Sequence, residues 1–121
     1  MVYLRGVTLV CWLALTVGLL HPKGGELSGL LLDPSWGYPD PSHLIAFAAL
    51  TALIYAARFP SRLLSSPVTL YGYGVVSEIA QLFVPGRHAM VMHGLANVLG
   101  ITVGLGICWL AIEPRLRGIN R

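Results

Sequence analysis

The chain contains 121 residues, enough for one domain, and 55% of them are hydrophobic while only 11% are charged. Because soluble domains carry about 25% charged residues, so few charges could not cover the surface of a water-soluble fold of this size. The net charge is +3, but no cluster of Lys and Arg accompanies a groove-binding motif. The composition therefore favours a membrane protein and argues against a nucleic-acid-binding one.

Four apolar segments are candidates to cross a bilayer, which takes about 20 apolar residues in a helix. They cover residues 3–20, 43–57, 67–84 and 90–112. The second is short but can begin earlier, at Pro41 and Ser42, and Pro114 is expected to end the fourth. We therefore predict an all-α integral membrane bundle of four transmembrane helices, which forms a single domain over residues 1–121.

The first of these segments also resembles a signal peptide, because Arg5 precedes its apolar core. No clear A-x-A cleavage site follows it. We therefore interpret residues 3–20 as the first transmembrane helix.

The placement of the basic residues predicts the orientation of the bundle, because cytoplasmic segments carry an excess of Lys and Arg. With the N-terminus inside, six basic residues fall in cytoplasmic segments and two in outer segments. The six are Arg5, Arg58, Arg62, Arg115, Arg117 and Arg121, and the two are Lys23 and Arg87. We expect both termini in the cytoplasm and a multi-pass protein of a cytoplasmic membrane.

Polar side chains gather toward the outer ends of three predicted helices. His43 opens the second helix, Glu78 and Gln81 lie in the last turns of the third, and His93 and Asn97 lie in the first turns of the fourth. Glu78 and Gln81 share a helix face because of their spacing, and so do His93 and Asn97. An ionisable side chain at membrane depth usually faces a bundle interior and marks a site, which makes Glu78 the strongest candidate.

Two interpretations of these polar residues remain open. In the functional one, the group binds a ligand, and its members are His43, Glu78, Gln81, Arg87, His93 and Asn97. In the structural one, the same side chains form a polar clasp that fixes helix packing. Gly100 and Gly104 continue the stripe of Asn97, and small residues at this spacing let helices approach closely. Histidine and glutamate suit zinc, but no HExxH or similar spacing is present, so we predict no metal and no other cofactor.

The segment SEIAQLFVPGRHAMVMHGLANVLGITVG resembles the signature of the VanZ-like family. That family typically shows a Glu-x-x-Gln pair, a Pro-Gly-Arg turn, an acidic residue, an Asn and spaced glycines. The matching residues are Glu78 and Gln81, then Pro85, Gly86 and Arg87, then Asn97, Gly100 and Gly104, with His43 in SHLIAFAAL as the histidine that begins the second helix. The resemblance covers about residues 40–107. The chain departs from the pattern at His93, where the family usually has an Asp, and it lacks the usual Asp-Lys ahead of the first histidine.

The resemblance implies a bacterial cytoplasmic membrane protein from a family linked to low-level resistance to the glycopeptide antibiotic teicoplanin. Three functions stay open. The first is recognition of an anionic lipid-linked or cell-envelope head group, with Arg87 pairing with its phosphate or carboxylate. The second is an enzyme acting on such a lipid, with Glu78 as general acid or base and His43 or His93 assisting. The third is a structural or regulatory subunit that associates with itself or another protein through Gly100 and Gly104.

Overall fold

The computed structural model describes residues 1–21, 41–61, 66–85 and 91–119. Within these ranges all regular structure is helical, which confirms the predicted all-α class and the four helices. The elements are α1 (Val2–Leu20), α3 (Pro41–Ala57), α4 (Pro67–Gln81) and α5 (Val91–Ile107), which continues through a π-helical turn (Cys108–Ile112) into α6 (Glu113–Ile119).

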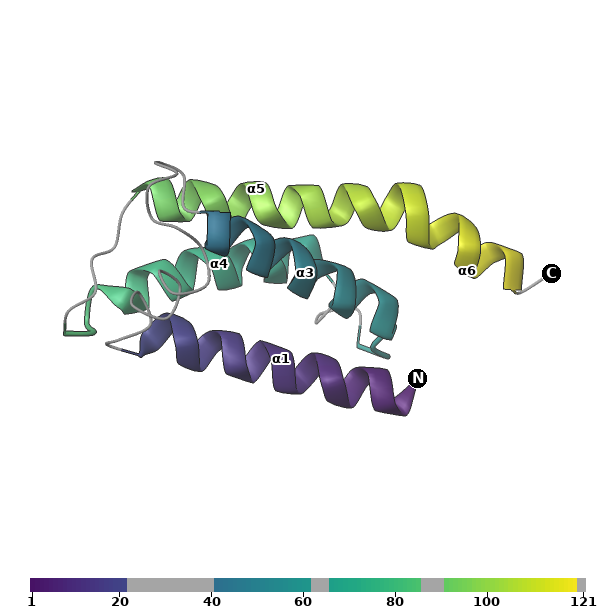
Figure 1. Cartoon of the computed structure of the whole chain (residues 1–121), viewed down its shortest axis with the longest axis horizontal. Coiled ribbons are helices and arrows are strands. Elements are labelled where there is room, and N and C mark those ends of the chain that lie inside the picture. The colour runs from purple at the N-terminus through teal and green to yellow at the C-terminus, as the bar shows by residue number, and fades with distance from the viewer. Residues whose placement is uncertain (22–40, 62–65, 86–90, 120–121) are drawn as a thin grey trace.

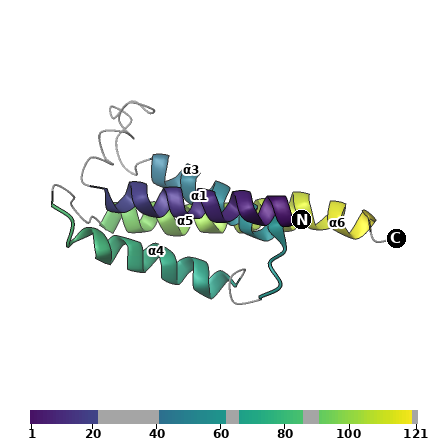
Figure 2. The ribbon, with the colours of Figure 1, turned by 90° about the horizontal axis from the view of Figure 1, so that it is seen from below.

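The helices alternate in direction, so both chain termini lie at the same end of the bundle (Figure 1). We call this the termini end, and we call the end where α3 and α5 begin the far end. Helix α3 packs most extensively against α5, while α1 packs against α3 and α4 and α4 packs against α5. The four helices therefore close into a ring, and they keep a common long axis in the perpendicular view (Figure 2).

Aromatic and aliphatic side chains from all four helices form the buried core. Its members are Leu19, Phe47, Leu50, Ile54, Leu70 and Ile101. Tyr73 joins three helices beside this core: its ring meets Trp12 edge-on at 5.5 Å and Phe47 at 5.7 Å between centroids, and its hydroxyl lies 2.7 Å from the hydroxyl of Thr16.

Two glycines of α5 lie where this helix approaches α3 most closely. A Cβ atom on Gly100 would lie 2.5 Å from the carbonyl oxygen of Leu44, and one on Gly104 would lie 2.7 Å from Cβ of Thr51. Real Cβ atoms do not approach other atoms this closely, so only glycine fits at these two positions without a shift of α3. The glycine stripe singled out in the sequence thus lies in the contact between α3 and α5.

Two predicted helix ends are wrong, each for a local reason. Helix α4 ends at Gln81 rather than at Val84, because the N–H groups of Leu82 and Val84 bond to carbonyls three residues back in a tightened last turn. The fourth helix does not stop before Pro114. The N–H of Glu113 bonds to the carbonyl of Cys108, and this wider π turn lets the helix continue through Pro114 as α6.

Two helical stretches are long and apolar enough to cross a membrane by length and composition, Val2–Leu20 and His93–Ile119, and the apolar helix Ser42–Ala57 is shorter. Large hydrophobic side chains are exposed along the bundle; in α1, for example, Val10 and Leu13 are 67% and 65% exposed. Such continuous apolar exposure is unusual for a water-soluble monomer.

The termini end is held together by charged side chains. Arg5 of α1 donates to the carbonyl oxygens of Ala57 (3.1 Å) and Arg58 (2.7 Å), and so it satisfies carbonyls at the C-terminus of α3. The hydroxyl of Tyr55 donates to Glu113, which also pairs with Arg117 at 3.0 Å.

Candidate functional site

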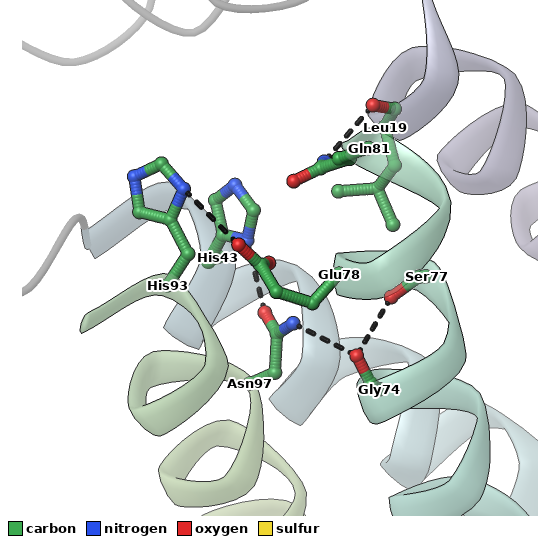
Figure 3. Close-up of polar contacts among 8 residues, drawn as sticks. All are labelled: Leu19, His43, Gly74, Ser77, Glu78, Gln81, His93 and Asn97. Atoms are coloured by element: carbon green, nitrogen blue, oxygen red, sulfur yellow. Dashed lines mark hydrogen bonds and ion pairs between the residues drawn. The ribbon is translucent and has the colours of Figure 1, made fainter. Parts of the chain in front are cut away.

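Four polar side chains from α3, α4 and α5 meet at the far end of the bundle (Figure 3). We call His43, Glu78, His93 and Asn97 the polar cluster. His43 lies in the first turn of α3, Glu78 in the last turn of α4, and His93 near the start of α5, with Asn97 one turn deeper. Because α4 runs toward this end while α3 and α5 start from it, three helix termini bring the side chains to one level.

Asn97 of α5 forms hydrogen bonds to both α3 and α4. Its Oδ1 lies 2.9 Å from Nδ1 of His43 on α3, and its Nδ2 donates to the carbonyl oxygen of Gly74 on α4 at 3.4 Å. The Asn97 side chain is 1% exposed and His43 is 8% exposed, so these bonds form away from solvent. Each bond therefore satisfies a buried polar group that would destabilise the fold if it had no hydrogen-bond partner.

Glu78 and His93 form the second half of the cluster. Oε1 of Glu78 lies 3.9 Å from Nδ1 of His93, a distance at which a protonated imidazole and a carboxylate attract each other. The His93 ring also stacks on the His43 ring, with 4.7 Å between centroids and 20° between planes. The Glu78 side chain is 14% exposed, so the carboxylate faces neighbouring helices instead of standing alone on the outer surface.

Gln81 does not join the polar cluster, although it lies with Glu78 in the last turns of α4 at the far end. It is 1% exposed, and its Nε2 donates to the carbonyl oxygen of Leu19 at 2.9 Å. Gln81 thus ties α4 to the last turn of α1 and satisfies one of the carbonyls that a helix end leaves open. Arg87 and His88 lie outside the described residues.

Sequence reasoning missed two contributors to this region. The backbone carbonyl of Gly74 accepts from Asn97 and also from the hydroxyl of Ser77, at 2.9 Å. A serine inside a helix often bonds back to a carbonyl of the preceding turn, which was the available signal for Ser77. Nothing in the spacing indicates that a side chain of another helix shares the same carbonyl.

The donor set of the cluster favours hydrogen bonding and proton exchange. It offers a carboxylate, two imidazoles and a carboxamide, all close to the end of apolar helices. Among the residues that the structure describes, no three His, Cys, Asp or Glu side chains are arranged to hold a metal ion. No protein-family model, curated protein or solved structure matches this chain.

Proposed function

We propose that the chain is a multi-pass protein of a bacterial cytoplasmic membrane and that its polar cluster recognises an anionic head group of a lipid-linked or cell-envelope ligand. The observation that carries the proposal is the convergence of His43, Glu78, His93 and Asn97 at one end of a bundle whose outer surface is apolar. A cluster of this kind is costly in hydrocarbon, and such clusters usually mark binding sites or pathways.

The charges in the described part of the chain support an orientation for this proposal. Its four arginines, Arg5, Arg58, Arg115 and Arg117, all lie at the termini end, opposite the polar cluster. Since basic residues favour the cytoplasmic side, the termini end would face the cytoplasm and the polar cluster the outer leaflet. The resemblance of residues 40–107 to the VanZ-like family agrees with a role in the envelope.

A matched pair of variants tests the binding proposal. Arg87 follows α4 closely in the chain, and we expect it to supply the cationic partner of the phosphate. With the full chain in phosphatidylcholine nanodiscs and a fluorescent polyprenyl diphosphate as probe, Arg87→Ala should weaken binding by about tenfold, the equivalent of about 1.4 kcal/mol. The control, Arg115→Ala, removes an exposed arginine at the opposite end and should leave Kd unchanged. Equal affinity of Arg87→Ala and the unaltered chain would refute the proposal.

A second candidate function is hydrolysis or transfer on such a lipid, and one contact favours it. The Glu78 carboxylate and the His93 imidazole are 3.9 Å apart, so a proton can pass between them once a ligand or water joins them. Glu78 would then be the general base. The substitution Glu78→Gln keeps the shape of the side chain but removes its basicity, so it should abolish turnover while Glu113→Gln, at the termini end, should not. Turnover that survives Glu78→Gln would exclude this assignment.

A further inference from the structure

We infer that Asn97 is a positioning residue that holds His43 as a neutral imidazole protonated on Nδ1, which leaves Nε2 as a hydrogen-bond acceptor for a hydroxyl or N–H group of the ligand. The choice of ligand group rests on the proposed binding function. The state of the His43 ring follows from the contacts alone, so the two claims can be tested apart.

The argument begins at the carbonyl oxygen of Gly74, which can only accept hydrogen bonds. The Asn97 carboxamide reaches it at 3.4 Å, so the NH₂ group must be on that side. With the amide reversed, Oδ1 of Asn97 would face the Gly74 carbonyl oxygen, and two acceptors would meet without a hydrogen between them. Asn97 is only 1% exposed, so water could not supply the missing hydrogen bond. Oδ1 of Asn97 therefore faces Nδ1 of His43 at 2.9 Å, and this nitrogen must carry the hydrogen.

The neighbours of His43 decide whether its second nitrogen is protonated as well. The ring stacks on His93 with 4.7 Å between centroids, and two imidazolium ions at that separation would repel each other. The Glu78 carboxylate lies 3.9 Å from His93 and attracts a positive charge onto that ring. The stack thus has room for one positive charge at most, and because the carboxylate lies beside His93 we assign that charge to His93 and a lone pair on Nε2 to His43.

The direction of this lone pair relates it to a ligand. Nδ1 of His43 faces Asn97, which lies one turn deeper in α5 than His93, so Nε2 points the opposite way, toward the far end (Figure 3). An acceptor beside a cationic His93 suits a head group that combines a phosphate with a hydroxyl. A phosphodiester with an alkyl group in place of the hydroxyl would lose the bond to His43.

Nitrogen NMR on the full chain in phosphatidylcholine nanodiscs tests the ring state. With ¹⁵N-labelled histidine, and with His43→Gln to assign the signals, His43 should show a protonated Nδ1 and an unprotonated Nε2 at neutral pH. Asn97→Leu removes the acceptor, and we expect its His43 signals to shift toward exchange between the two tautomers. A protonated Nε2 on His43 in the unaltered chain would overturn the inference, whether or not the variant folds.

Lipid binding measured by native mass spectrometry tests the ligand class. Phosphatidylglycerol and phosphatidylmethanol carry the same charge, but only the first has free hydroxyls. The chain should bind phosphatidylglycerol about threefold to tenfold more tightly, the effect of one hydrogen bond. His43→Phe keeps a stacking ring without the acceptor and should erase this preference, whereas His21→Phe should preserve it. Equal binding of both lipids by the unaltered chain overturns the ligand class, while binding of neither contradicts the proposed function and leaves the NMR result to decide the ring state.

Discussion

Asn97 contributes more to the far end than its single side chain suggests, because it bonds to two other helices at once. Through His43 it reaches α3, and through the Gly74 carbonyl it reaches α4. These partners are polar groups that no aliphatic side chain could satisfy. The structural and functional interpretations of the cluster are therefore compatible, since the bond that fixes the packing also orients His43.

The first prediction follows from these two bonds. Asn97→Leu keeps a similar volume but leaves the Nδ1–H of His43 and the Gly74 carbonyl without this partner, and we expect it to lower the free energy of unfolding by about 1–2 kcal/mol. Unfolding in mixed micelles of mild detergent and SDS measures the change. Val103→Leu is the control on α5, because Val103 is 44% exposed, so the change places a leucine in the same helix without removing a hydrogen bond. A loss no larger than that of the control would show that the two bonds of Asn97 contribute nothing.

At the residue scale, helical periodicity was sufficient to predict that most residues of the polar cluster lie close together. The spacing of Glu78, His93 and Asn97 predicted side chains at one level, and the structure brings these together with His43. Periodicity could not predict that Gln81 bonds to α1, because that depends on how α4 is rotated about its axis. The stacking of the His43 and His93 rings could not be predicted from the sequence either, since it depends on the distance between α3 and α5.

At the scale of helices, the contact between α3 and α5 determines that distance. The second prediction is that Gly100→Ala lowers the free energy of unfolding by about 1–3 kcal/mol, because the new methyl group would meet the Leu44 carbonyl and force the helices apart. Gly106→Ala is the control, since no atom outside the adjoining backbone of its own helix lies within 4 Å of its added Cβ, and alanine favours the helix by up to about 1 kcal/mol. The same SDS titration compares the two. Equal stability of the two variants would contradict the packing argument.

Separation of α3 from α5 should also be visible in the polar cluster. His43 lies one residue before Leu44, so a shift of α3 at Gly100 would move its ring away from His93.

Helix ends were harder to predict than this contact, as Pro114 illustrates. Proline normally ends a helix, but the π turn just before it moves the conflicting carbonyl, and no local sequence pattern announces such a turn.

At the scale of the whole molecule, the two ends of the bundle differ in chemistry while its sides are largely apolar. The termini end carries arginines that bond to backbone carbonyls and to Glu113, and the far end carries a carboxylate, imidazoles and amides. Low charge and apolar segments in the sequence predicted the sides correctly. The arrangement of the helices in a closed ring depends on side-chain packing between segments far apart in the chain, which composition does not encode.

The third prediction concerns how the bundle lies in a membrane. In a chain with Cys11→Ser and Cys108→Ala, a single cysteine introduced by Pro85→Cys at the far end or by Ser61→Cys at the termini end would report on each side, because both positions are exposed. If the bundle spans the membrane with its arginines inside, a membrane-impermeant maleimide added to intact bacterial cells should label the Pro85→Cys variant, and it should label the Ser61→Cys variant only after permeabilisation. Labelling of both variants in intact cells would mean that the bundle does not separate the two compartments, and the reverse pattern would put the polar cluster in the cytoplasm. The reverse pattern would remove the outer leaflet as the source of the ligand, since the polar cluster can only meet lipid head groups on the side to which the far end is exposed.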